Sequence, residues 1–431
     1  MVLAALLGLL ALLLLLAIGV PIFAALMGVS AALLLSEGKS IAGLGQHVLD
    51  HLNSLTLMAV PFFVLAAVLM KGGGIARALF DWATVLVGRM PGGLPIAAIL
   101  ATAVFAAING SSVATALAMG TMVVPLLTER GYDRRFVLGL VASAGTLGIL
   151  IPPSLPLVVY GLVSETSVPR LFLAGVVPGL MQVLFFAAIV LVKERRAVAG
   201  GAVRSLAEAL PWGRTTVRAV PAVSVPVIVL GGIYTGLVTV TEAAALAAVA
   251  ALAVNQLIYR SVSLPQLPPM VVEAMESTAK VIMIVASALL LSHWIGLSGL
   301  ARELTRIVTD AGLEDWQFLL LMCAILLIMG TLLEGYSIIL ITVPVTLPIL
   351  DALSIDTVHY GIILILTIEI AMLTPPIGLN LFVMAGVARA PIAEVARGVA
   401  PFFAAMVVLL LLVAFVPALS TALPNLVFGV R

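Results

Sequence analysis

The stretches GTLGILIPPS, residues 145–154, and LTPPIGLN, residues 373–380, decide the fold. Each places two consecutive prolines inside a long apolar run, where they remove backbone donors and break a membrane helix. At membrane depth such a break is tolerated only where its polar backbone groups line a cavity or bind a ligand. Broken helices at matching positions in two halves of a chain are typical of transporters and mark the binding site.

The two halves of the chain are related by a fixed offset of 223 residues. The offset relates six pairs of identical residues: Pro125/Pro348, Asp133/Asp356, Pro152/Pro375, Pro153/Pro376, Gly175/Gly398 and Pro178/Pro401. We therefore predict a duplicated chain, with a first inverted repeat over residues 1–192, a linker over 193–219 and a second inverted repeat over 220–431.

The composition is that of an integral membrane protein. Hydrophobic residues make up 63% of the 431 residues, charged residues only 10%, and the mean hydropathy is +1.28. The lipid bilayer is therefore the first expected partner. A net charge of +1 lacks the basic excess typical of nucleic-acid binding, so we expect no nucleic-acid partner. We find no catalytic triad, phosphate loop or metal-ligand spacing of histidines, and we expect no enzyme activity.

Apolar runs of about 17–25 residues predict the helices that cross the membrane. We expect ten crossings, near residues 1–18, 20–36, 56–70, 136–164, 171–192, 220–236, 237–259, 280–297, 360–388 and 399–420. Two stretches, 93–128 and 317–350, are predicted as hairpins that enter and leave on one side. The predicted fold class is an all-α polytopic membrane protein with an inverted repeat, two re-entrant helical hairpins and two broken helices, 136–164 and 360–388.

The distribution of Lys and Arg predicts the orientation of the chain in the membrane. The linker 193–218 carries six basic residues against two acidic ones, so we expect it in the cytoplasm. Basic residues also flank hairpin 93–128, whereas few flank hairpin 317–350, so the two hairpins should open from opposite faces. Five crossings in each half require the second half to be inserted upside down. Both termini are then expected outside the cell.

Two stretches, 75–90 and 299–316, separate a crossing from a hairpin in each half. The second mixes apolar and charged residues at near-helical spacing, which predicts a helix that lies along the membrane interface. Such a helix would serve as an arm that joins a fixed part of the molecule to a moving part. The alternative is an ordinary surface helix.

The two hairpin tips are predicted at Asn109-Gly-Ser-Ser112 and Glu334-Gly-Tyr-Ser337. Glycine permits a tight turn, and serine, asparagine and carbonyl oxygens suit a small hard cation. Ends of half-helices also favour ions. The alternative is that both tips are simple turns with helix caps. The predicted cation ligands are Gly110, Ser111, Ser112, Gly148 and Pro152 in the first half, and Gly335, Ser337, Thr374 and Pro375 in the second.

Charged residues at membrane depth are expected to have a function. Glu334 lies in the second tip, where it either shapes the ion or substrate site or has a structural role. Glu369 lies six residues before Pro375 and either has a structural partner in the bundle or belongs to the site. Glu242 instead fits a capping box with Thr239.

Several motifs together resemble the large membrane subunit of tripartite ATP-independent periplasmic (TRAP) transporters. They are NGSSVAT at 109–115, RGYD at 130–133, GTLGILIPPS at 145–154, LFLAG at 171–175 and TPPIGLN at 374–380. The resemblance implies a sodium-driven, elevator-type secondary transporter in a bacterial inner membrane, with sodium ions as the bound cations. It also implies two partners, a small four-helix membrane subunit and a periplasmic substrate-binding protein. The sequence contains no additional four-helix segment, so we expect the small subunit to be a separate protein.

The expected substrate is an organic carboxylate, with C4-dicarboxylates, sialic acid and other sugar acids left open. We assign substrate binding to polar residues of the tips and breaks: Asn109, Ser112, Ser154, Glu334, Tyr336 and Asn380. Two alternatives are a stand-alone sodium/dicarboxylate transporter without a binding protein, and a channel or passive scaffold. The moving unit is predicted to contain both hairpins and both broken helices, carried against a scaffold of residues 1–70, 171–192, 220–297 and 399–420.

Overall fold

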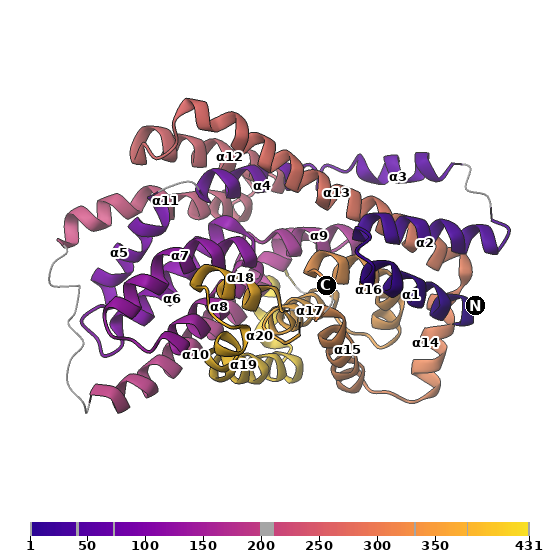
Figure 1. Ribbon diagram of the computed structural model, residues 1–431. Coiled ribbons are helices and arrows are strands. Elements are labelled where there is room, and N and C mark those ends of the chain that lie inside the picture. The colour runs from indigo at the N-terminus through magenta and orange to yellow at the C-terminus, as the bar shows by residue number, and fades with distance from the viewer. Residues whose placement is uncertain are drawn as a thin grey trace.

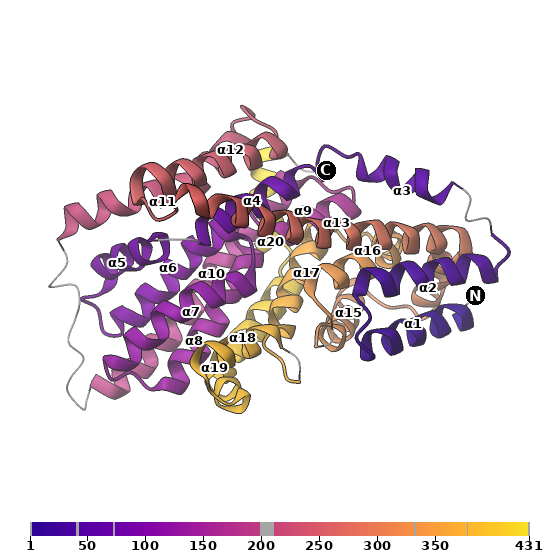
Figure 2. The ribbon, with the colours of Figure 1, turned by 45° about the horizontal axis from the view of Figure 1, so that its top comes forward.

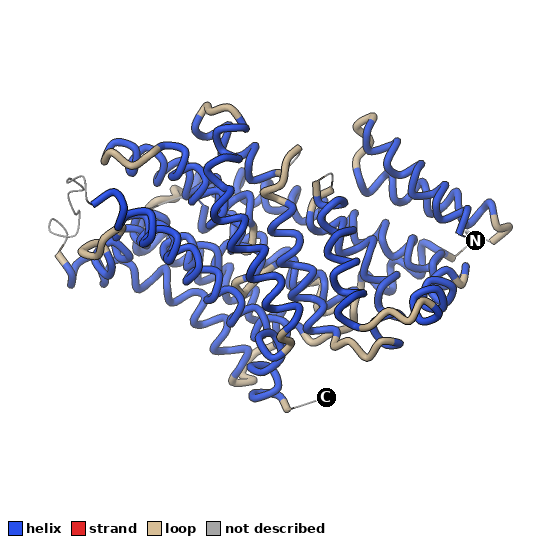
Figure 3. Tube along the Cα trace, turned by 90° about the horizontal axis from the view of Figure 1, so that it is seen from below, coloured by secondary structure: helices blue, strands red, loops and turns tan. Residues whose placement is uncertain are grey.

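The computed structural model describes residues 2–39, 43–71, 74–198, 211–331, 333–376 and 378–429. Within these ranges the protein is helical throughout and contains no strand (Figure 1; Figure 3). Eight helices in the described part are long and apolar enough to cross a membrane, or nine if one bent pair counts as a single span. The prediction of an all-α polytopic membrane protein is therefore confirmed at this level.

The first half contains ten helices in the described part of the chain. They are α1 (Val2–Ala17), α2 (Ile22–Ser36), α3 (Leu44–Leu52), α4 (Ala59–Lys71), α5 (Ile75–Val87), α6 (Gly93–Asn109), α7 (Ser112–Glu129), α8 (Arg134–Leu150), α9 (Leu155–Val163) and α10 (Val168–Val198). The second half contains ten further α-helices in that part, besides a π-helical turn at Val254–Tyr259 and a short 3-10 turn at Leu264–Gln266. They are α11 (Trp212–Tyr234), α12 (Val240–Ala253), α13 (Leu267–Ser298), α14 (Leu300–Asp310), α15 (Asp315–Gly330), α16 (Gly335–Ala352), α17 (Thr357–Ala371), α18 (Leu379–Ala388), α19 (Ile392–Phe415) and α20 (Ala418–Phe428).

Corresponding helices in the two halves begin at the predicted offset. Helices α7 and α16 both start and end 223 residues apart, and α8 and α17 also start 223 residues apart. The shared start of the second pair has a local cause, because Asp133 and Asp356 each accept a hydrogen bond from a backbone N–H of the first turn. This spacing supports the duplication, while the opposite insertion of the two halves in the bilayer stays a prediction.

The two proline breaks lie where the sequence predicts them. Helix α8 ends at Leu150 and α9 begins at Leu155, so the first Pro-Pro pair lies between two apolar segments that together form one candidate membrane span. In the second half α17 ends at Ala371 and α18 begins at Leu379. Each predicted hairpin is a pair of helices, α6 with α7 and α15 with α16, and each predicted arm is a helix, α5 and α14. The predicted capping box of Thr239 and Glu242 is also confirmed.

Some predicted boundaries are wrong. The second tip was predicted at 334–337, but α16 begins at Gly335, so Gly335, Tyr336 and Ser337 form its first turn and Glu334 is its N-cap. The predicted linker 193–219 is helical up to Val198 and again from Trp212, because α10 and α11 extend past their apolar cores. Its residues 199–210 lie outside the described part. Helix α13 begins at Leu267 rather than near 280, since prolines are tolerated in the first turn of a helix.

The helices form two packed groups, shown from two sides in Figures 1 and 2. Helices α1, α2, α4, α11, α12 and α13 pack on one another, and we call this group the scaffold. Helices α6 to α10 and α15 to α20 pack around α8 and α17, and we call this group the core unit. The predicted scaffold wrongly included 171–192 and 399–420, because α10, α19 and α20 pack on α8 and α17 instead.

Close contact between α8 and α19 depends on glycine. A Cβ at Gly398 would lie 1.9 Å from the carbonyl oxygen of Arg135, and a Cβ at Gly139 would lie 2.0 Å from the carbonyl carbon of Gly398. Small residues allow two helix backbones to approach this closely within a membrane. This crossing attaches α19 to the core unit. The periodicity of the sequence alone does not reveal that α8 and α19 are in contact.

We predict that Gly398→Ala destabilises the protein, because the added methyl group forces α8 and α19 apart. Overpacking of this kind costs about 1–3 kcal/mol. The measurement is the midpoint of thermal unfolding in detergent. Gly231→Ala is the matched control, since a Cβ on Gly231 in α11 meets nothing within 4 Å. Equal midpoints for the two variants would contradict the packing described here.

Candidate functional site

The first hairpin tip lies directly against the first helix break. Gly110 turns the chain with a φ of +61°, and a Cβ placed on it would lie 3.3 Å from the carbonyl oxygen of Pro153. A Cβ on Gly148 would lie 2.8 Å from the carbonyl oxygen of Ser111 and 3.1 Å from the amide nitrogen of Ser112. Gly110, Ser111, Ser112 and Gly148 of the first predicted cation set thus lie close together beside the Pro152-Pro153 break. Ser111 caps α7 by accepting a hydrogen bond from the backbone N–H of Ala114.

The first tip is also bonded to the second break, a contact that the sequence did not predict. Ser112 Oγ donates to Asn380 Oδ1 at 3.0 Å, and Asn380 Nδ2 lies 2.8 Å from the same Oγ. The amide of Asn380 also donates to the carbonyl oxygen of Ala142 in α8 at 3.1 Å. Both side chains are buried. Two predicted substrate ligands therefore hold each other and join the halves of the core unit.

The second tip packs on α17 ahead of the second break. A Cβ on Gly335 would lie 3.0 Å from Ile368 Cγ2, six residues before Thr374. The hydroxyl group of Ser337 is buried and has no hydrogen-bond partner among the described residues. Thr374 Oγ1 donates to the carbonyl oxygen of Ile370 at 2.8 Å, which satisfies it within its own helix. Among the described residues, no side-chain hydrogen bond joins Ser337 to Thr374, and the hydroxyl group of Ser337 is left available to another ligand.

A cavity of about 240 Å³ lies between both tips and the scaffold. Asn109 and Ser111 line it from the first tip, and Glu334 and Tyr336 line it from the second. Three of the six predicted substrate residues, Asn109, Glu334 and Tyr336, thus face one space, although Asn109 is more than 200 positions away from the other two in sequence. Ser154 does not line this cavity. Its hydroxyl group donates to the carbonyl oxygen of Ile149 at 2.5 Å, within the first break.

Scaffold residues that the sequence analysis missed complete this cavity. Lys71 at the end of α4 forms an ion pair with Glu273 of α13 at 2.8 Å, and both line the cavity. Lys280 lines it one to two turns further along α13, and its ammonium group has no ion pair among the described residues. The sequence signal was available, because Glu273 and Lys280 are charged residues in a predominantly apolar helix.

Glu369 lies in the interior of the core unit and does not line this cavity. Its carboxylate oxygens have no hydrogen-bond partner in the part of the chain described, although the side chains of Gln182 and Thr146 lie nearby. Gln182 Nε2 donates to Thr146 Oγ1 at 3.2 Å. The position of Glu369 between α8, α10 and α17 separates it from the cavity that both tips line.

Comparison with known proteins identifies the family to which this architecture belongs. A sequence profile described as "Tripartite ATP-independent periplasmic transporter, DctM component" matches residues 9–419. The C4-dicarboxylate TRAP transporter large permease protein DctM of Pseudomonas aeruginosa is 41% identical, covering 93% of each chain. The sialic acid TRAP transporter large permease protein SiaM of Vibrio cholerae is 33% identical, covering 95% of this chain and 96% of that protein.

A solved structure shares the fold at low sequence identity. The YdaH transporter of Alcanivorax borkumensis superposes with a TM-score of 0.63 at 14% identity, covering 88% of this chain and 89% of that one. This likeness concerns the fold alone. The predicted resemblance is confirmed by the family match and by the high coverage of the relatives. The chain is therefore a member of the DctM family of TRAP transporter large permeases, a multi-pass membrane transport protein rather than an enzyme.

Proposed function

We propose that this permease imports an organic carboxylate, coupled to sodium, by an elevator movement of the core unit against the scaffold. One observation carries the proposal. The 240 Å³ cavity is lined by both hairpin tips on the core unit and by Lys71, Glu273 and Lys280 on the scaffold. A substrate bound there contacts the surfaces of both groups, and a sliding movement between them changes the side from which it is reached.

The polar groups of the cavity suit a small carboxylate. Lys280 offers a cation without an ion pair among the described residues, and Asn109 and Tyr336 offer an amide and a hydroxyl donor. Relatives are named for C4-dicarboxylate, sialic acid and 2,3-diketo-L-gulonate, all organic anions. Three relatives, at 41%, 37% and 36% identity, are named for C4-dicarboxylates, and another at 37% is named for isethionate. C4-dicarboxylates are therefore our first choice of substrate.

Sodium binding is proposed at the first tip. Backbone oxygens of Ser111 and Pro153 lie close to Gly148 and Gly110, and such oxygens are hard ligands that suit a small cation. A second site near Ser337 would use its unpartnered buried hydroxyl group, together with Gly335, Thr374 and Pro375. Cations at these tips would also offset the repulsion between a bound carboxylate and Glu334.

The elevator movement is proposed from the packing. Both tips and both breaks belong to the core unit, and Asn380 bonds Ser112 and Ala142 within it. Moving one hairpin alone would break these contacts and dismantle the cation ligands. Moving the whole core unit preserves them, while the contacts to α4 and α13 change. Helices α5 and α14 connect the scaffold to the hairpins and serve as arms in this scheme.

The proposed partners are a small four-helix membrane subunit and a periplasmic substrate-binding protein, in a bacterial inner membrane. Family membership supports this assembly, because the family is described as tripartite. The alternative is a stand-alone sodium/dicarboxylate transporter of the same fold. Uptake with and without the binding protein separates the two, since only the alternative transports without it.

We predict that uptake into proteoliposomes requires sodium. Replacing external sodium by choline at constant ionic strength should reduce initial uptake at least tenfold, because the oxygen ligands of the tips are left without their cation. A protonophore should leave sodium-driven uptake largely intact, as the control for proton coupling. Undiminished uptake in choline would rule out the sodium sites.

We also predict that Lys280→Gln weakens transport. A charge-assisted hydrogen bond to a carboxylate is worth about 1.5–3 kcal/mol, which corresponds to a loss of roughly 10- to 150-fold in kcat/KM. The measurement is the concentration dependence of uptake from the binding protein. Arg214→Gln is the control, since Arg214 is exposed on scaffold helix α11 and does not line the cavity. Equal kinetics for the two variants would remove Lys280 from the site.

A further inference from the structure

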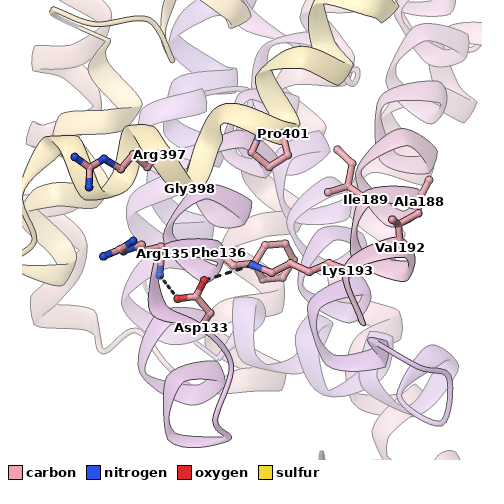
Figure 4. A pocket seen from close by; sticks show the side chains of 10 residues that line it. All are labelled: Asp133, Arg135, Phe136, Ala188, Ile189, Val192, Lys193, Arg397, Gly398 and Pro401. Carbon is pink, nitrogen blue, oxygen red and sulfur yellow. Dashed lines mark hydrogen bonds and ion pairs between the residues drawn. The ribbon is translucent and has the colours of Figure 1, made fainter. Parts of the chain in front are cut away.

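A second and larger pocket, of about 860 Å³, lies where the start of α8, the end of α10 and the start of α19 meet. None of the predicted site residues lines it. Figure 4 shows Arg135 and Arg397 on one side of this pocket and Ile189 and Val192 on the other. The pocket therefore has a cationic end and an apolar wall.

The glycine crossing of α8 and α19 builds this pocket. Gly398 contacts the backbone of Arg135, so the two helices approach closely and set their arginines side by side at the same end. Pro401 lies one turn after Arg397 on α19. Together with Ile189 and Val192 of α10 it forms the apolar wall of the pocket. The arginine pair is thus a consequence of the helix packing and not a chance meeting of surface side chains.

The three cations of the pocket differ in what holds them. The ammonium group of Lys193 lies 3.4 Å from Asp133 Oδ2 and 3.9 Å from the centre of the Phe136 ring, so it is already engaged. The guanidinium groups of Arg135 and Arg397 are exposed and have no ion pair or hydrogen bond among the described residues. Free guanidinium groups bind phosphate oxygens in a fixed, bidentate geometry.

The duplication allows the three cations of this pocket to be compared with the residues at corresponding positions of the other repeat. At an offset of 223, the counterparts of Arg135, Lys193 and Arg397 are Val358, Val416 and Ala174. The corresponding positions of the other repeat therefore carry none of the three cations. The pocket includes Lys193, where the basic stretch 193–218 begins, and the positive-inside rule predicts this end in the cytoplasm. Anionic lipids give the cytoplasmic leaflet its negative surface, which such basic pockets attract.

We propose that this pocket binds an anionic phospholipid of the cytoplasmic leaflet. The phosphate diester lies between Arg135 and Arg397, and an acyl chain follows Ile189, Val192 and Pro401 out into the bilayer. A single phospholipid fits the mixture of two unpaired cations and an apolar wall better than a soluble anion, which leaves the wall exposed. The site lies on the core unit, so the bound lipid would move with it. The lipid assignment does not depend on the substrate or on sodium coupling.

Native mass spectrometry of the purified chain tests the proposal, with phosphatidylglycerol and phosphatidylcholine as probes. The wild-type protein should retain one phosphatidylglycerol in preference to phosphatidylcholine. The double variant Arg135→Gln/Arg397→Gln should lower the phosphatidylglycerol-bound fraction about tenfold, the loss expected for charge-assisted bonds. The control Arg89→Gln/Arg214→Gln removes two exposed arginines predicted on the same membrane face but outside the pocket. It should bind as the wild type does.

Further arms separate the remaining outcomes. Arg135→Lys/Arg397→Lys should retain most of the binding if charge attracts the lipid, and it checks that the double variant has not simply unfolded. Val192→Trp should reduce binding by filling the apolar wall. Equal lipid retention by the pocket and control variants would overturn the proposal. Displacement of the lipid by millimolar inorganic phosphate would overturn it as well.

Discussion

The structure depends on one constraint, that the backbone opened by each Pro-Pro pair has to be satisfied away from lipid. The first break is covered by a hairpin tip, with Gly110 close to the carbonyl oxygen of Pro153 and Gly148 against Ser111. The second break contributes Asn380, whose side chain bonds both Ser112 and Ala142. These contacts explain why two helical hairpins and two broken helices form one packed unit, and why polar oxygens lie close together within it.

Local sequence features predicted those parts of the fold that have local causes. Pro152 and Pro375 mark the breaks, and Gly110 marks the first turn. The capping of the following helices by Asp133 and Asp356 was not predicted, although the offset had paired these two residues. The second tip was displaced, because Glu334 takes the N-cap position and Gly335, Tyr336 and Ser337 form the first turn of α16. The assignment of α10 and α19 to the scaffold failed because it depends on the Gly139 and Gly398 crossing, which involves residues far apart in sequence.

The sequence predicted the residues that the hairpin tips contribute to the candidate site, but not those that the scaffold contributes. Asn109, Glu334 and Tyr336 were found because polar residues stand out in an apolar hairpin, whereas Lys71 and Lys280 come from scaffold helices with no break or turn to single them out. The bond between Ser112 and Asn380 spans 268 residues, and the offset does not reproduce it, because the counterpart of Asn380 is Leu157. The two repeats thus share the arrangement of their helices but differ in the polar side chains that they place at corresponding positions. Those differing side chains form the candidate site.

The central claim is that the hairpins and broken helices move together relative to the scaffold. The direct measurement is the distance between spin labels in a Cys323→Ala background, with and without sodium and substrate. One pair joins exposed positions Glu129 and Asp351 within the core unit, and the other joins Asp351 to exposed Glu276 on scaffold helix α13. The account predicts that the distance between Glu129 and Asp351 stays unchanged, and that the distance between Asp351 and Glu276 shifts. A first distance that changes while the second stays fixed would show hairpins gating around a stationary core, and would contradict it.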